Sequence, residues 1–130
     1  MQRLEKAIAG LEQAVVAAPA AGAPPAGHAE ADQAWRYAVR EQLLDVADAL
    51  AEESAGADDG WLSAREDLLR RDRKRMLTRL SLLAPEIAQA GDVESVRVSV
   101  CRFVRDLQRH LQRMHDLLYD AVGMEVGGSE

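Results

Sequence analysis

The chain has 130 residues, a length that suits one domain with a buried core. Hydrophobic residues make up 48% of it but aromatic residues only 4%, so the core must consist of Leu, Val and Ala, and an all-helical, soluble protein is indicated. The formal net charge of −6 argues against a dedicated binder of nucleic acid or of anionic membranes. The single cysteine, Cys101, excludes an internal disulfide, and with no recognisable signal peptide or spanning segment we expect a reduced, cytoplasmic protein.

The first predicted element is a short amphipathic helix over residues 2–18. Its apolar residues recur at alternating spacings of four and three, which is typical of a narrow two-heptad seam: Leu4, Ile8, Leu11, Val15 and Ala18. Residues 19–28 contain three of the four prolines and predict a flexible Pro/Ala/Gly linker. The length of this linker leaves open whether the first helix packs on its own bundle or on another copy.

Two longer helices are predicted next, over residues 29–54 and from Trp61 to just before Gly91. The expected core face of the second helix is Trp35, Ala38, Val39, Leu43, Val46, Ala49 and Leu50, and that of the third is Trp61, Leu62, Leu68, Leu69, Met76, Leu80, Leu83 and Ile87. Asp58 or Asp59 could cap the third helix, and Pro85 should kink or break it near its end.

The fourth helix is expected over residues 92–122, with Asp92 as its N-terminal cap and residues 123–130 as a frayed tail. Its apolar stripe is the longest in the chain: Val93, Val96, Val100, Phe103, Val104, Leu107, Leu111, Met114, Leu118 and Val122. Four helical segments, of which the second to fourth are joined by short connections, predict an antiparallel up-down four-helix bundle with its core in residues 29–122.

Polar side chains interrupt these apolar faces and are the candidates for a polar pocket: Gln42 on the second helix, Arg65 and Asp72 on the third, and His110 and His115 on the two margins of the fourth. A charge in an apolar arc is costly unless it is paired, and Asp72 could pair with Arg79 or His110. One interpretation is that these charges fix the register of the helices. The other is that an Asp–Arg–His group binds a ligand or holds a proton.

The basic run Arg70–Arg75 lacks interleaved aromatic residues and spreads around its helix, so it does not indicate nucleic-acid binding. An acidic flank on the second helix, formed by Glu41, Asp45, Asp48 and Glu52, could face this run and neutralise it within the chain. The arginines of the fourth helix are likewise expected to be offset by Asp106, Asp116 and Asp120.

The segment HLQRMHDLLYD places His115 five residues before Asp120 on the last predicted helix. This spacing resembles the ligand pair on the fourth helix of the hemerythrin-like cation-binding family, whose fold is a four-helix bundle around a di-iron centre. That resemblance also implies histidine ligands on the other helices, and the three helices predicted before residue 92 contain none, so no metal centre of that kind is expected. The closing YDAVGMEVGGSE is similar to the end of small helical proteins of high-GC actinobacteria, which implies no activity.

No phosphate-binding glycine loop, nucleophile elbow or paired-cysteine motif is present. Cys101 and His110 are nine residues apart on one helix, about 13 Å in rise, so neither can activate the other there. We therefore expect a non-catalytic, cofactor-free interaction or assembly module, and the heptad seam of the first helix suggests a homodimer. The alternative is a ligand- or metal-binding bundle of degenerate hemerythrin-like type.

Overall fold

The computed structural model describes residues 2–18, 28–53, 63–89 and 91–128, with the side chains of 28, 53, 63–65 and 120–128 left out. These residues form four helices: α1 (Gln2–Val16), α2 (His28–Glu53), α3 (Ser63–Gln89) and α4 (Val93–Gly128). No strand occurs in the described part of the chain, which confirms the all-α prediction. Among the same residues, no helix combines the length and the apolarity needed to cross a membrane.

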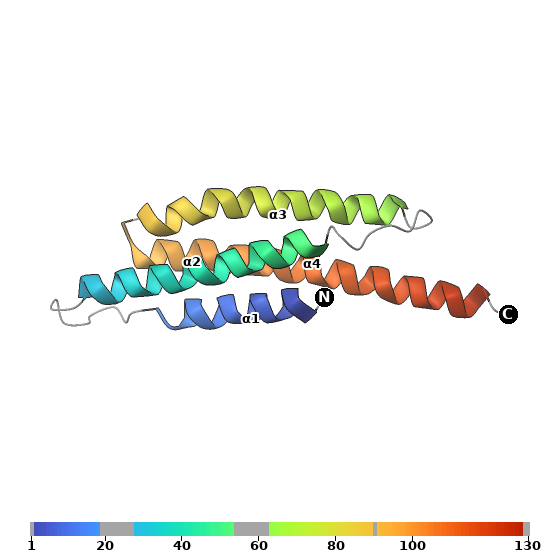
Figure 1. Ribbon diagram of the computed structural model, residues 1–130, viewed down its shortest axis with the longest axis horizontal. Coiled ribbons are helices and arrows are strands. Elements are labelled where there is room, and N and C mark those ends of the chain that lie inside the picture. The colour runs from blue at the N-terminus through green and yellow to red at the C-terminus, as the bar shows by residue number, and fades with distance from the viewer. Residues whose placement is uncertain (1, 19–27, 54–62, 90, 129–130) are drawn as a thin grey trace.

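The four helices run alongside one another as an up-down bundle, and each packs against its two neighbours in the order α1, α2, α3, α4 and back to α1. The start of α1 and the end of α4 therefore face the same end of the molecule (Figure 1). At this end α4 runs well past the start of α1, and α3 also begins beyond it (Figure 1). All four helices therefore lie side by side only along the length of α1, which has 15 residues against 36 in α4, and only the α3–α4 pair continues to the tip (Figure 1).

In this chain α1 packs against its own α2 and α4, and the linker predicted before α2 lies largely outside the described residues. Leu4, Ile8, Leu11 and Val15 are all buried, and Ala7 joins them. Each such side chain contributes about 2 kcal/mol when it leaves water. Surface ion pairs contribute up to about 1 kcal/mol, so the apolar seam holds α1 in place more than its charges do.

The core contains most of the side chains that periodicity selects. Buried are Trp35, Val39, Leu43, Val46, Ala49 and Leu50 from α2, Met76, Leu80, Leu83 and Ile87 from α3, and Val96, Val100, Phe103, Val104 and Leu107 from α4. Ala38 was expected among them but is exposed. Trp61 and Leu62 lie outside the described residues.

Two predicted core residues, Leu68 and Leu118, are 65% and 52% exposed. They belong to the parts of α3 and α4 near the tip, where α1 and α2 no longer cover the pair (Figure 1). Helical periodicity identifies the face that is apolar, but it does not say how far a covering helix reaches. The tip of the α3–α4 pair therefore presents leucines to solvent.

The helix ends confirm one prediction, correct two, and exclude one of the two effects expected of Pro85. Asp92 caps α4, since its side chain accepts a hydrogen bond from the Glu94 backbone N–H at 3.1 Å. Pro85 does not break α3, which continues to Gln89. The last turn of α3 is held by the fully buried Ile87, whose carbonyl accepts a hydrogen bond from Arg36 on α2 at 2.8 Å.

The two corrections concern α2 and α4. The second helix begins at His28, so it contains a histidine that the linker was expected to hold. The fourth helix continues six residues beyond Val122 to Gly128, through the segment expected to be frayed. Extension of an existing helix adds one backbone hydrogen bond for each residue fixed and needs no new nucleation step. Of the predicted tail, residues 129 and 130 lie outside the described part.

Candidate functional site

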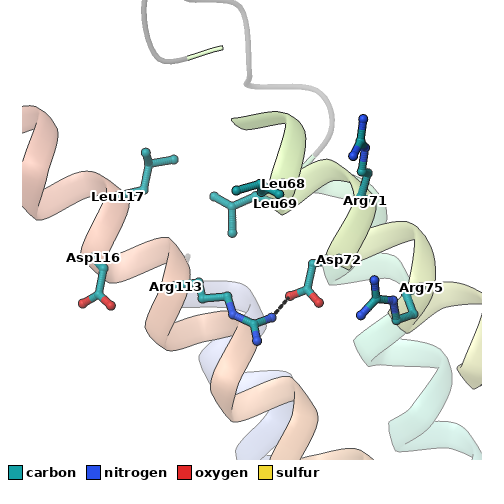
Figure 2. A pocket seen from close by; sticks show the side chains of 8 residues that line it. All are labelled: Leu68, Leu69, Arg71, Asp72, Arg75, Arg113, Asp116 and Leu117. Atoms are coloured by element: carbon teal, nitrogen blue, oxygen red, sulfur yellow. Dashed lines mark hydrogen bonds and ion pairs between the residues drawn. The ribbon is translucent and has the colours of Figure 1, made fainter. Parts of the chain in front are cut away.

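A hollow of about 500 Å³ lies between α3 and α4 at the tip of the bundle, and we call it the α3–α4 groove. It is lined by Leu68, Leu69, Arg71, Asp72 and Arg75 from α3 and by Arg113, Asp116 and Leu117 from α4. Figure 2 shows the leucines of α3 and α4 on opposite sides of the groove, with Arg113 reaching across to Asp72. The groove is open to solvent and combines apolar walls with five charged side chains.

Asp72, His110 and Arg113 form a polar cluster at the inner side of this groove. The Oδ2 atom of Asp72 lies 2.7 Å from Nδ1 of His110 and 2.8 Å from a terminal nitrogen of Arg113. An ionised carboxylate can only accept, so Nδ1 of His110 carries the hydrogen. The His110 side chain is 0% exposed and that of Asp72 only 9%, whereas Arg113 is 56% exposed. Asp72 and His110 thus join α3 to α4 from within, and Arg113 closes the contact from the solvent side.

The pKa of Asp72 is set by two opposing effects. Burial raises the pKa of this carboxyl, but the hydrogen bonds from His110 and Arg113 and the positive charge of Arg113 lower it, and the net shift is downward. Asp72 is therefore ionised at neutral pH although little of it is exposed. An ion held in this way favours the interpretation that the polar side chains fix the packing of the helices.

The structure brings together only part of the predicted polar pocket. Asp72 and His110 are paired as expected, but His110 is fully buried instead of lying on the margin of its helix. Exposed His115 lies 3.0 Å from Glu5 of α1, and Gln42 lies beside Gly10, also of α1. The side chain of Arg65 lies outside the described part of the chain. Arg79 pairs with Asp106 of α4 and stacks over Phe103, so it is not the partner of Asp72.

The predicted neutralisation of α3 by the acidic flank of α2 is wrong. Arg3 of α1 takes that place, with ion pairs to Asp45, Asp48 and Glu52. The error has a simple cause, because α1 and α3 both border α2 and the sequence of α2 does not say which neighbour its acidic flank faces. Of the Arg stripe on α4, Arg109 lies 3.6 Å from Asp106 as predicted, but Arg113 points to α3 instead.

Three basic residues of α3 lack an ionic partner within the described part of the chain: Arg71 and Arg75, which line the groove, and Lys74, which does not. We call them the basic rim. They are exposed and fall on one side of the helix, since they are spaced by three and four residues. Their neighbour Arg70 pairs with Asp67 at 2.8 Å, and Arg73 is buried.

Two residues of structural importance were missed by sequence reasoning. Arg36 is buried on α2, where it pairs with Asp32 at 2.6 Å and bonds the end of α3. The position of Asp32, four residues before Arg36, could have predicted their ion pair, but nothing in the sequence indicates the hydrogen bond from Arg36 to the end of α3. Arg113, three residues after His110, was assigned to a solvated stripe. Only the rotation of α4 relative to α3 reveals that it reaches Asp72.

Within the described residues, no three His, Cys, Asp or Glu side chains are close enough together to hold a metal ion. His115 contacts Glu5 and His110 contacts Asp72, so the two histidines of α4 serve different contacts. Comparisons of the chain with protein-family models, curated proteins and solved structures found no match. The resemblance to hemerythrin-like proteins stays a prediction.

Proposed function

We propose that this chain is a non-catalytic interaction module that holds another protein in the α3–α4 groove. The observation that carries the proposal is the coincidence, in one place, of solvent-exposed leucine and uncompensated positive charge. Leu68 is 65% exposed beside a hollow that also contains Leu69 and Leu117. Exposed apolar surface next to polar side chains is typical of a protein-binding site.

The chemistry of the groove supports binding over catalysis. Its walls are built from leucine, arginine and aspartate, so they carry no hydroxyl or thiol nucleophile. Asp72, the one carboxylate that is little exposed there, already accepts hydrogen bonds from His110 and Arg113. A carboxylate committed to two donors inside the protein serves the packing of α3 on α4 better than it serves as a general base.

Affinity capture from an extract of the natural host cells tests the proposal, with three forms of the protein as bait. Leu68→Asp places a charge on the apolar wall of the groove, while Leu44→Asp makes the same change on α2, where Leu44 is 46% exposed and does not line the groove. We expect a protein that the wild type and Leu44→Asp retain at similar levels and that Leu68→Asp loses. Equal capture by all three forms would show that the groove is not the binding surface.

Assembly as a homodimer is a second part of this proposal, taken from the heptad seam of α1. The α1 seam packs against α2 and α4 of its own chain, so a dimer through α1 would require exchange of this helix between copies. Light scattering after gel filtration distinguishes the possibilities. A dimer that becomes monomeric with Leu11→Asp supports exchange, and a monomer in both forms ends it.

A ligand-binding bundle is the alternative function, favoured by the volume of the groove, which falls in the range of small-molecule sites. Native mass spectrometry of the purified protein would show a retained small molecule as added mass. Metal analysis of protein purified without a His tag addresses the hemerythrin-like variant. Stoichiometric iron, manganese or zinc would favour this alternative over the interaction module.

A further inference from the structure

The basic rim is a set of charges for which the described part of the chain provides no counter-ion. Arg71, Lys74 and Arg75 are exposed, and none of them takes part in an ion pair there. The chain as a whole is acidic, with a net charge of −6, so an excess of basic residues in the composition does not explain why the basic rim is exposed and lacks an ion pair in the described chain. An acidic partner would remove this imbalance.

The acidic residues of α2 that were expected to neutralise the basic residues of α3 already form ion pairs with Arg3. Arg3 contacts three carboxylates along that flank, with N–O distances of 3.8 Å to Asp45 and 4.0 Å to Asp48. The third contact of Arg3 is with Glu52. The acidic flank of α2 thus faces α1, and the described part of the chain offers the basic rim no counter-ion.

The apolar part of the groove determines what shape that partner has. Leu68 and Leu69 of α3 stand across from Leu117 of α4, on two helices whose covering neighbours α1 and α2 stop short of the tip (Figures 1 and 2). A trough between two helices receives a third helix through apolar side chains at positions i, i+3, i+4 and i+7. The basic rim lies on the α3 side of the trough, so carboxylates on one flank of such a helix would meet it.

We infer that the occupant of the α3–α4 groove is an amphipathic helix of a partner protein, with leucine-like residues on one face and Asp or Glu along one flank. This inference rests on the proposed function and adds the chemistry of the partner to it. The apolar face covers Leu68, Leu69 and Leu117, and the acidic flank pairs with the basic rim. Arg113, which is 56% exposed while it bonds Asp72, provides a further contact at the centre.

A nucleic acid fits the same surface less well. Among the described residues, no aromatic side chain that could stack on a base lines the groove. The leucine side chains of the groove make no favourable contact with a charged phosphodiester backbone. The combination of apolar walls and a basic rim therefore selects an acidic helix over a polyanion.

The experiment measures the binding of three fluorescent peptides of about four turns. The first has Leu at helical spacing on one face and Glu along the flank, the second has Lys in place of every Glu, and the third has the composition of the first in scrambled order. A duplex DNA of similar charge is the fourth probe. We expect micromolar binding of the acidic peptide, weakening with added salt, and at least about 10-fold weaker binding of the other three.

Charge reversal on the protein tests whether the acidic peptide binds at the basic rim. Arg71→Glu combined with Arg75→Glu should weaken the acidic peptide about 10-fold or more and strengthen the basic one. A matched control reverses two exposed arginines that do not line the groove, Arg40→Glu with Arg105→Glu, and should leave the preference for the acidic peptide in place. Circular dichroism and urea midpoints of both double variants confirm that each is folded.

The outcomes separate this inference from the function on which it rests. If the acidic peptide does not bind up to about 1 mM, if the basic peptide or DNA binds as well, or if both double variants lose it equally, the acidic-helix inference is overturned. Should capture from extract still depend on Leu68 in that case, the groove would remain an interaction site for a partner of different chemistry. Loss of both results would reject the two proposals together.

Discussion

The Gln42 side chain of α2 lies against Gly10 of α1, in the space that a side chain at position 10 would need, whereas α3 and α4 are separated at the tip by a groove of about 500 Å³. Both pairs join antiparallel helices of one bundle. In the α1–α2 pair the acidic flank is paired with Arg3, and the apolar seam of α1 is buried. In the α3–α4 pair Leu68 is exposed and the basic rim has no counter-ion in the described chain.

This difference shows how one bundle can be both stable and available for binding. Helices of unequal length leave the longer pair uncovered at one end, and α4 with 36 residues is more than twice as long as α1 with 15. The covered region supplies the burial on which folding depends. The uncovered region can then present leucine and arginine to a partner, while the Asp72–His110 contact at its inner side holds α3 on α4.

The largest loss of stability is expected from Leu11→Asp, which disrupts the packing of α1 against its neighbours. Leu11 is 0% exposed, and replacing a buried leucine by a small residue costs about 2–5 kcal/mol even before a carboxylate is placed in the core. We expect a loss of at least about 4 kcal/mol in the free energy of unfolding, measured by urea denaturation, or release of α1 with a loss of helix by circular dichroism.

Gln13→Asp is the matched control for this change, since Gln13 is exposed on the same helix. It should shift the urea midpoint only slightly. If Leu11→Asp were tolerated as well as Gln13→Asp, the packing of α1 on its own bundle would be wrong.

The packing of α1 also shows what sequence can and cannot predict here. Apolar residues at helical spacing predicted all four helices and nearly all of the core, because the spacing that defines the apolar face is contained within each helix. The polar contacts were harder. His110 was placed at a margin and Arg3 was not considered, since their environments depend on how each helix is rotated against its neighbours.

The groove itself could not be predicted for a related reason. Leu68 and Leu118 carry the same periodic signal as the buried Leu80 and Leu107. What distinguishes them is the point along the bundle where α1 and α2 end, and that is a property of the assembled helices (Figure 1). Asp72 was expected to need a partner because it falls in an apolar arc, and the structure pairs it with His110, one of the two partners considered.

An intermediate effect is expected from Asp72→Asn, which tests whether the buried cluster fixes α3 on α4. A hydrogen-bonded charge of this kind contributes roughly 2 kcal/mol, so the variant should be less stable than wild type by about that amount at pH 7. The folded-state pKa of Asp72 lies below its ordinary value of 3.8, so folding favours the ionised form. Its contribution is therefore present above about pH 4 and is lost as the pH falls towards the folded-state pKa.

The stability difference between wild type and Asp72→Asn should accordingly shrink below about pH 4, as measured by urea denaturation across the acid range. Glu94→Gln is the control. A hydrogen bond and the charge of Arg97 also lower the pKa of Glu94, but this pair is exposed, so its removal should have no resolvable effect. A difference for Asp72→Asn that did not change with pH would mean that its ionisation contributes nothing to folding.

The smallest change in stability is expected from Gly10→Ala, which tests how closely Gln42 of α2 packs against Gly10 of α1. Alanine is favoured over glycine within a helix by about 1 kcal/mol, but in Gly10→Ala the new methyl group must displace the amide end of Gln42. Because that end is flexible, we expect a net stabilisation below about 1 kcal/mol. In a Gln42→Ala background the obstacle is gone, so Gly10→Ala should yield the full helical gain. Urea midpoints of the four proteins in this double-mutant cycle measure the difference, and a coupling energy of zero would mean that Gln42 does not contact position 10 in solution.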